Sequence, residues 1–207
     1  MPKTFKTEQE FFWAGEFGDA YVDRNNSAQL LTANIALFAD IFKRTRNVTS
    51  VMEFGANIGM NMKAINKILI DVKLSAVEIN TNAYEQLKKI NNLTAHNCSI
   101  LEFCPREKYD FVFTKGVLIH LSPDELDGVY QKIYDTSLKY ICIVEYYNPS
   151  PVAIPYRGHE NRLFKRDFAG EMLDKFPNLK LIDYNFVYRR DNNFAQDDVT
   201  WFLMEKI

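Results

Sequence analysis

This sequence of 207 residues has few of the features that mark exported, membrane or metal-binding proteins. No apolar run reaches the roughly 18 residues that a membrane span needs, and acids interrupt the N-terminus where a signal peptide needs an apolar core. The three cysteines lack CxxC spacing, so a disulfide framework is not expected, and the three histidines are too widely spaced for a metal site. We therefore expect a cytoplasmic protein without a bound metal.

The charge balance lacks the basic excess of a general nucleic-acid binder. The formal net charge is -2 and the sequence pI is about 6.0, so only a local basic patch could face a phosphate backbone. Hydrophobic residues make up 47% of the chain, which is enough for a full core, and the length suits one domain rather than two. We expect a single domain over residues 1–207 that binds neither nucleic acid nor a membrane.

Strand-like and helix-like segments alternate from residue 50 onward. Short apolar runs predict strands, and apolar positions at three- and four-residue spacing predict the helices between them. The expected strands are 50–54, 73–79, 93–99, 109–115 and 139–147. One helix is expected after Ser27 as N-cap and a second over 59–69. A third should follow Asn82 as N-cap with Glu85 as its capping-box partner, and a fourth should span 122–138 with Ser122 as N-cap. This alternation predicts a parallel sheet with helices on both faces.

The C-terminal pattern differs, because two strand candidates follow one another without a helix between them. Residues 179–190 and 198–207 are joined by the stretch DNNFAQD. They predict a hairpin that adds an antiparallel strand to the sheet. The expected fold class is therefore α/β, with a mostly parallel seven-stranded sheet and a C-terminal antiparallel hairpin.

The stretch VMEFGANIGMN, residues 51–61, leads from the first strand into a helix through two glycines. Ligands of open α/β sheets bind at the carboxyl ends of the strands, where this turn lies. A dinucleotide site requires G-x-G-x-x-G, whereas Gly55 and Gly59 are separated by three residues and Asn57 would crowd a pyrophosphate. This pattern disfavours a nicotinamide oxidoreductase.

Two acids end the first two strands. Glu53 points an acid at the glycine turn, and Glu78 falls where dinucleotide folds place a ribose-binding carboxylate. S-adenosylmethionine has a cationic amino-acid end, two ribose hydroxyls and no phosphate, so it suits this pair better than a nucleotide does. Each acid also has a simpler explanation, since Glu53 could serve a helix N-terminus and Glu78 could be a solvated strand end.

The motifs VMEFGANIGMN, AVEIN and YDFVFTKGVLIHLSPDEL together resemble the class I, Rossmann-like S-adenosylmethionine-dependent methyltransferases, from residue 27 onward. The chain departs from that family at Asn57, where many members have glycine, and at Ser99, near which members often have an acid for the adenine amino group. The resemblance implies S-adenosylmethionine as cofactor, bound by Glu53, Gly55, Ala56, Asn57, Gly59, Glu78, Ile79, Ser99, Ile100, Thr114, Lys115 and Gly116.

Residues 1–26, which we call the cap segment, are rich in aromatic residues and acids. Trp13 and Tyr21, together with Phe17, could fold over the cofactor, because an aromatic face beside a sulfonium contributes about 0.5–2 kcal/mol. Simple docking of the segment on the core would explain the same residues.

Three segments outside the shared core, 11–25, 144–173 and 193–206, are similar to methylases associated with pseudaminic acid biosynthesis. That resemblance implies a small, anionic, sugar-derived acceptor such as a nonulosonic acid or a nucleotide sugar. An insertion at 148–177 is then expected on the acceptor side of the site. Its basic cluster could bind an anion or be a solvated face. The candidate acceptor-binding residues are Tyr147, Asn148, Tyr156, Arg157 and Arg162.

Methyl transfer from a sulfonium requires alignment, and a general base adds about 10²–10⁴-fold when the acceptor must lose a proton. Four residues are candidates for that base: His120, Glu145, Tyr146 and His159. His120 could equally be a packed histidine at a loop-helix junction. Two other functions stay open, a non-catalytic cofactor-binding partner of a biosynthetic complex and a methyltransferase for another small molecule.

Overall fold

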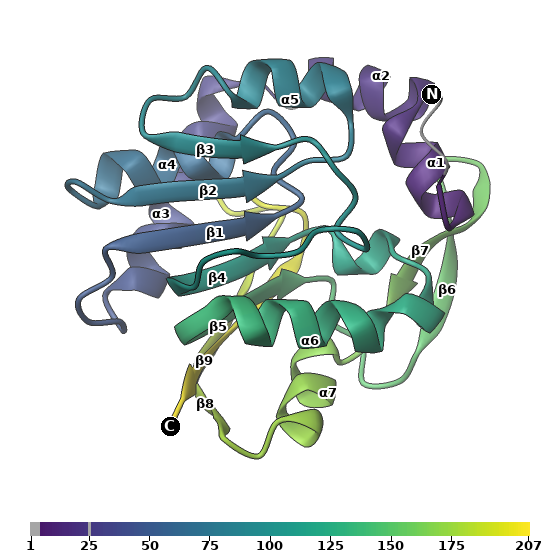
Figure 1. Cartoon of the computed structure of the whole chain (residues 1–207). Coiled ribbons are helices and arrows are strands. Elements are labelled where there is room, and N and C mark those ends of the chain that lie inside the picture. Colours follow the sequence, from purple (N-terminus) through teal and green to yellow (C-terminus); the bar gives the residue numbers. More distant parts are fainter. Residues whose placement is uncertain (1–4, 25) are drawn as a thin grey trace.

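The computed structural model describes residues 5–24 and 26–207, and its centre is one seven-stranded sheet (Figure 1). Residues 1–4 and 25 of the predicted cap segment lie outside the described residues. The strands are β1 (Ser50–Phe54), β2 (Lys73–Val77), β3 (Leu93–His96), β4 (Tyr109–Lys115), β5 (Ser137–Glu145), β6 (Val152–Tyr156), β7 (His159–Lys165), β8 (Leu179–Val187) and β9 (Val199–Lys206).

The order across the sheet is β3-β2-β1-β4-β5-β9-β8. Strands β1 to β5 pair in parallel, whereas β9 runs antiparallel to both of its neighbours, β5 and β8. The predicted α/β class, the seven strands and the C-terminal antiparallel hairpin are therefore confirmed. Strands β6 and β7 form a separate antiparallel pair that the sequence patterns did not predict.

Helices cover both faces of the sheet, with α3 and α4 on one side and α6 and α7 on the other (Figure 1). The α-helices are α1 (Glu8–Ala14), α2 (Glu16–Arg24), α3 (Ala28–Phe42), α4 (Met60–Ile68), α5 (Thr81–Leu87), α6 (Leu126–Thr136) and α7 (Phe168–Lys175), and two 3₁₀ turns span Leu118–His120 and Pro123–Glu125. In the part of the chain that the structure describes, no helix has the length and apolar character to span a membrane.

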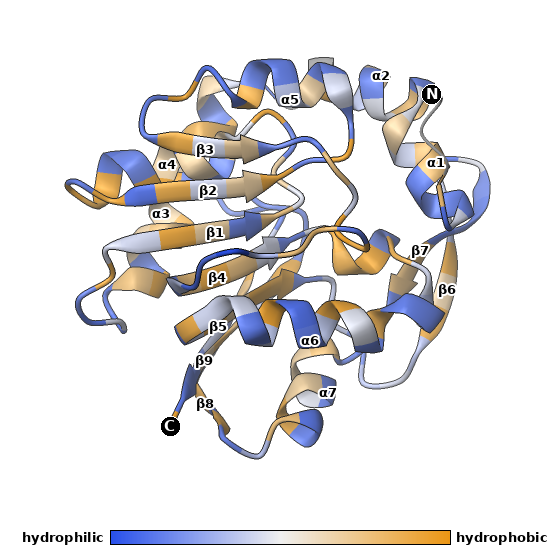
Figure 2. Ribbon diagram, in the orientation of Figure 1, coloured by the Kyte–Doolittle hydropathy of each residue, from blue (hydrophilic) through white to orange (hydrophobic). Residues whose placement is uncertain are grey.

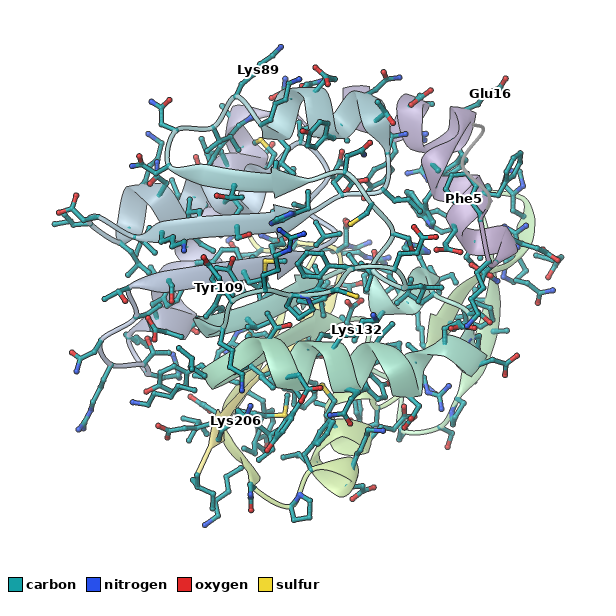
Figure 3. All side chains as sticks on the ribbon, viewed as in Figure 1. Phe5, Glu16, Lys89, Tyr109, Lys132 and Lys206 are labelled. Atoms are coloured by element: carbon teal, nitrogen blue, oxygen red, sulfur yellow. The ribbon has the colours of Figure 1, made fainter. Side chains whose placement is uncertain are left out.

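Strand alternation divides the apolar side chains between two cores. In β4, Phe111 and Phe113 pack with α3, whereas the intervening Val112 packs with α6. Apolar residues dominate the central strands in Figure 2, while hydrophilic residues face outward on the helices. Lys89 and Glu16 are exposed and project away from the body of the protein (Figure 3). Both faces of the central strands β1, β4 and β5 are thus buried, as expected for parallel strands, whereas the edge strand β8 is largely exposed.

The helix caps agree with the sequence in one case and correct it in two. Ser27 caps α3 as predicted, since its hydroxyl accepts from the Leu30 N–H at 3.0 Å. The prediction that Asn82 caps the next helix was wrong: α5 begins two residues earlier, and Asn80 accepts from the Ala83 N–H at 2.9 Å. Ser122 makes no side-chain cap, because the chain first forms a 3₁₀ turn and α6 starts only at Leu126.

The regions without clear periodicity have defined structure. Part of the cap segment forms α1 and α2, and residues 148–177 contain the β6–β7 hairpin and α7. Helix α1 and the hairpin lie beside each other at the carboxyl ends of the parallel strands (Figure 1). These additions therefore stand at the edge of the sheet where ligands of α/β proteins bind.

Candidate functional site

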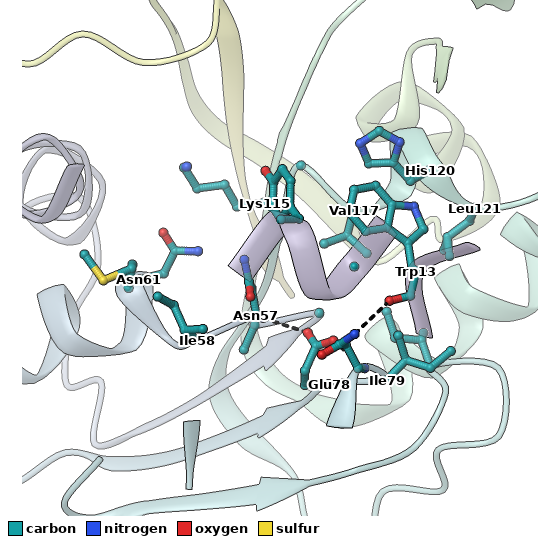
Figure 4. Close-up of a pocket in the computed structure, with 18 of the residues that line it drawn as sticks. Trp13, Asn57, Ile58, Asn61, Glu78, Ile79, Lys115, Val117, His120 and Leu121 are labelled. Carbon is teal, nitrogen blue, oxygen red and sulfur yellow. Dashed lines mark hydrogen bonds between the residues drawn. The ribbon is translucent and has the colours of Figure 1, made fainter. Parts of the chain in front are cut away.

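A cavity opens at the carboxyl ends of β1, β2 and β4, beneath the cap segment (Figure 4). Most of the predicted cofactor residues line it, whereas Glu53, Gly59 and Thr114 lie outside its lining. The predicted residues in the lining are Trp13, Tyr21, Gly55, Ala56, Asn57, Glu78, Ile79, Ser99, Ile100, Lys115 and Gly116. Segments far apart in the sequence therefore meet at one site.

The turn after β1 depends on two glycines with positive φ. Gly55 has φ 79°, and a Cβ there would lie 2.6 Å from a methyl carbon of Val117. Gly59 has φ 76° and stands at the start of α4, where a Cβ would lie 2.4 Å from Ile90 Cδ1. The conformation and the space both require glycine. Asn57 also has a positive φ, 49°, which asparagine tolerates better than most residues.

Replacing Gly59 with alanine is expected to destabilise the protein by about 2 kcal/mol, through the left-handed conformation and the contact with Ile90. Gly128 in the middle of α6 is the matched control, because nothing lies within 4 Å of a Cβ there. Gly128→Ala should stabilise by about 0.5–1 kcal/mol. Urea unfolding of both variants measures the difference, and equal effects would contradict the role of the turn.

Glu78 is buried at the end of β2, and its two carboxylate oxygens hold the surrounding backbone. One oxygen accepts from the Asn57 N–H and the other from the Asn80 N–H, both at 2.7 Å. Burial raises the pKa of this carboxyl, while the backbone donors lower it. The alternative of a solvated strand end was wrong, because the side chain is 7% exposed. Glu78 joins the glycine turn to the wall of the cavity.

Asn61 and Lys115 line the opposite end of the cavity, and Glu53 is fully buried directly behind Asn61. Glu53 Oε1 accepts from Asn61 Nδ2 at 2.6 Å, but Glu53 Oε2 and Asn61 Oδ1 have no partner within residues 5–24 and 26–207. Lys115 points toward the same cavity, and its ammonium forms no hydrogen bond or ion pair with another described residue. Burial lowers the pKa of Lys115, while the nearby carboxyl groups of Asp197, Glu53 and Glu145 favour its charged form. Acceptors without partners beside a buried ammonium suit a zwitterionic amino-acid group.

The pKa of Glu53 makes the stability of the unliganded protein depend on pH. Burial raises this pKa to about 8, so the native state holds a proton that the unfolded chain releases at lower pH. The resulting stability is present at acid pH and is lost as pH rises through about 8. Between pH 6 and 8, the free energy of unfolding of the parent should fall by about 2 kcal/mol more than that of Glu53→Gln, which has no carboxyl to ionise at this position. Parallel pH dependence of thermal unfolding in the two proteins would contradict this assignment.

Aromatic side chains of the cap segment and the hairpin surround the mouth of the cavity. The Trp13 ring lies 5.2 Å from Tyr21, 4.7 Å from His120 and 6.3 Å from Tyr156, measured between ring centroids. The Trp13 backbone carbonyl accepts from Asn80 Nδ2 at 3.3 Å, which ties α1 to the sheet (Figure 4). The indole N–H is buried and has no partner in the described chain.

His120 is the only one of the four base candidates that lines the cavity. Its Nδ1 lies 2.5 Å from the carbonyl oxygen of Arg162, which can only accept, so the proton is on Nδ1. Burial lowers the pKa of His120 to about 4, and the ring is therefore neutral at pH 7. Nε2 carries the free lone pair and has no hydrogen-bond partner among the described residues.

The other three candidates lie outside the lining. Glu145 is buried behind the loop that follows β4, where its Oε1 accepts from the N–H groups of Val117 and Leu118 at 2.9 and 3.0 Å. Burial raises the pKa of Glu145 to about 7. Tyr146 is half-buried beneath the Lys165 ammonium, and burial raises the pKa of its hydroxyl. His159 is exposed, with its ring 5.0 Å from that of Phe12.

The predicted acceptor residues also lie outside the cavity lining. Arg162 is engaged in an ion pair with Glu8 at 3.0 Å, which holds the hairpin against α1. Tyr147 is exposed, and Asn148 Nδ2 donates to the backbone carbonyl of Ser150 in the same loop. Arg157 is exposed and lies over the Tyr156 ring, whose other contacts are Trp13, Phe17 and His120. Part of the basic cluster therefore serves the packing of the hairpin.

Helix α1 beyond Trp13, helix α3 and the β8–β9 loop also contribute to this cavity, which the sequence patterns did not predict. Gln9 and Glu10 of α1, Asn34 of α3, and Gln196 and Asp197 of the loop all line it. Gln196 Nε2 donates to Asn34 Oδ1 at 3.0 Å, so the loop is fixed to the helix. The pattern T-x-x-E at residues 7–10 was a signal of a capped helix, and the structure has that capping box.

Across residues 5–24 and 26–207, no group of three or more histidine, cysteine, aspartate or glutamate side chains is placed to hold a metal ion. Polar side chains stand at both ends of the cavity, with Glu78 at one end and Asn61 and Lys115 at the other.

Neither the protein-family models nor the curated proteins contain a match to this sequence. Solved structures match its fold. The 1,6-didemethyltoxoflavin N1-methyltransferase of Burkholderia thailandensis, with its substrate and S-adenosylhomocysteine, has a TM-score of 0.72 at 15% identity over 100% of this chain and 92% of that one. Coclaurine N-methyltransferase with N-methylheliamine and S-adenosylhomocysteine has a TM-score of 0.70 at 10% identity over 91% and 81%.

A glycopeptide N-methyltransferase in complex with S-adenosylhomocysteine gives a TM-score of 0.65 at 11% identity, over 94% of this chain and 99% of that one. At identities this low, the matches establish the fold alone. They extend along nearly the whole chain in each case. The chain therefore has the fold of the class I S-adenosylmethionine-dependent methyltransferases, as its motifs predicted.

Proposed function

We propose that this protein is an S-adenosylmethionine-dependent methyltransferase for a small, anionic, sugar-derived acceptor. The observation that carries the proposal is the cavity at the carboxyl ends of β1, β2 and β4, with Glu78 at one end and, at the other, Asn61 and Lys115 backed by the buried Glu53. The solved methyltransferases of this fold that carry S-adenosylhomocysteine support it.

The residues present fit S-adenosylmethionine. Asn61 Oδ1 can accept from its ammonium group, and so can Glu53 Oε2 once that carboxyl releases its proton beside the bound cation; the Lys115 ammonium can pair with its carboxylate. Glu78 can accept from the ribose hydroxyls with the lone pairs that Asn57 and Asn80 leave unused. When bound, the cofactor supplies a methyl group on a cationic sulfur.

The protein's own residues then align the acceptor and exclude water. Trp13, Tyr156 and His120 form a wall that keeps the cavity mouth apolar. The neutral His120 can accept a hydrogen bond from the acceptor's hydroxyl or amine at Nε2, because Nδ1 is occupied by the Arg162 carbonyl. This bond orients the acceptor's lone pair, and Nε2 takes up the proton that the acceptor atom loses when it gains the methyl group.

Two basic residues of the hairpin remain available for an anionic acceptor. Arg157 and Lys165 form no ion pair with any residue in the described ranges, and each lies over a tyrosine ring close to the site, Tyr156 and Tyr146. A carboxylate or phosphate of the acceptor can bind there. The resemblance of the hairpin and its flanks to methylases associated with pseudaminic acid biosynthesis favours a nonulosonic acid or nucleotide sugar as that anion.

The test is a screen of acceptors with S-adenosylmethionine, in which mass spectrometry detects methylated products. We expect transfer to acidic sugars or nucleotide sugars, and weaker transfer to neutral sugars with the same hydroxyl and amine groups. Transfer only to neutral or aromatic acceptors would contradict the acceptor class. Cofactor binding without transfer to any acceptor would instead favour a non-catalytic binding partner.

A further inference from the structure

One wall of the cavity, where we place the adenine of the cofactor, has no carboxylate from the strand ends that form it. After β3 the chain contributes Ser99 and Ile100 to the lining, and Ile79 follows β2 on the same side. Two of these side chains are apolar. The Ser99 hydroxyl donates to the Glu10 carboxylate, so its proton is already used. The sheet itself therefore offers no carboxylate to an amino group at this wall.

Glu10 brings a carboxylate to this wall from the cap segment. It lies on α1, is 5% exposed, and lines the cavity together with Ser99 and Ile100. Its Oε2 accepts from the N–H groups of Lys6 and Thr7 at 2.7 and 2.9 Å, which completes the capping box of α1. These contacts fix the carboxylate in one orientation, with Oε1 turned toward Ser99.

This carboxylate has unused capacity. Within the described chain Glu10 forms no ion pair, and Oε1 has one hydrogen-bond partner, the Ser99 hydroxyl. A carboxylate oxygen accepts two hydrogen bonds, and burial without a cation is unfavourable unless those positions are filled. A ligand with an N–H donor at this wall would fill the remaining position.

We propose that the Glu10 carboxylate accepts a hydrogen bond from the 6-amino group of the cofactor's adenine. This inference rests on the proposed function, because it assigns one contact to the same cofactor. The acid that recognises the base comes from the cap segment, while the acid assigned to the ribose, Glu78, belongs to the sheet. Adenine binding and docking of α1 consequently stabilise each other, since the contact exists only when both are in place.

The experiment compares S-adenosylhomocysteine with its analogue in which hydrogen replaces the 6-amino group. Isothermal titration calorimetry measures both affinities for the full-length protein. We expect the parent protein to bind the analogue at least about tenfold more weakly, the loss of one hydrogen bond to a charged acceptor. In Glu10→Ala, the two ligands should bind with nearly equal affinity. In Glu10→Gln, a neutral acceptor remains, and the ratio should fall to an intermediate value.

Glu8→Ala is the matched control, because it removes a carboxylate from the same helix and breaks the ion pair with Arg162. It should weaken both ligands together and keep the parent's ratio. An unchanged ratio in the Glu10 variants, or equal binding of both ligands by the parent, would overturn the assignment and leave Glu10 as a helix cap. Failure of the parent to bind S-adenosylhomocysteine at all would instead overturn the proposed function, on which the assignment rests.

Discussion

Glu78→Ala is expected to weaken S-adenosylhomocysteine binding by about 10²–10⁴-fold. The change removes the acceptor that we propose for two ribose hydroxyls, and each hydrogen bond to a charged group contributes about 1.5–3 kcal/mol. It also releases the N–H groups of Asn57 and Asn80, which shape the turn and the start of α5. The lost affinity therefore has a direct part and a part that comes from the loosened cavity wall.

Two further variants separate these parts. Glu78→Gln keeps one acceptor oxygen and should fall between the parent and the alanine variant in calorimetric titration. Glu85→Ala removes an exposed acid of α5 that pairs with Lys88, and its affinity should equal that of the parent. Binding undiminished in a folded Glu78→Ala protein would show that the cofactor is assigned to the wrong cavity.

His120→Phe is expected to lower kcat by about 10²-fold with little change in the affinity for S-adenosylhomocysteine. A phenyl ring preserves the packing against Trp13 and Tyr156 but removes Nε2, the proposed acceptor for the substrate's proton. Because the pKa of His120 is about 4, the parent's rate should show no histidine limb between pH 6 and 7. Initial rates across pH, with an acceptor found in the screen, measure both effects.

His159→Phe provides the comparison. This ring is exposed and contacts Phe12 and Phe17 on the outer side of α1 and α2, so kcat should stay within about twofold of the parent. If the two variants lost activity equally, the distinction that the cavity makes between the two histidines would be wrong. If only His159→Phe were impaired, the acceptor would lie outside the cavity.

The fold could be predicted from local patterns because its strands and helices have strong ones. The strands 50–54 and 109–115 agree with β1 and β4 residue for residue, since both are apolar runs with clear ends. The cap of α5 could not be chosen by sequence alone. Asn80 and Asn82 are both good N-cap residues, and the position where β2 ends decides between them.

The part of the site built by the glycine turn and the strand ends could be predicted, because spacing places those residues together. The contribution of Glu10 could not, because it depends on the contact of α1 with Ser99, eighty-nine positions along the chain. Arg162 shows the opposite case. Its charge suggested an acceptor-binding residue, but the fold places it against Glu8, and a single sequence carries no signal of such a pairing.

The central claim is that this cavity binds S-adenosylmethionine, and calorimetric titration with S-adenosylhomocysteine alongside NADH tests it most directly. We predict micromolar or tighter binding of S-adenosylhomocysteine and no heat from NADH, because Asn57 occupies the turn where a pyrophosphate would lie. Binding of NADH alone, or of neither ligand, would contradict the account.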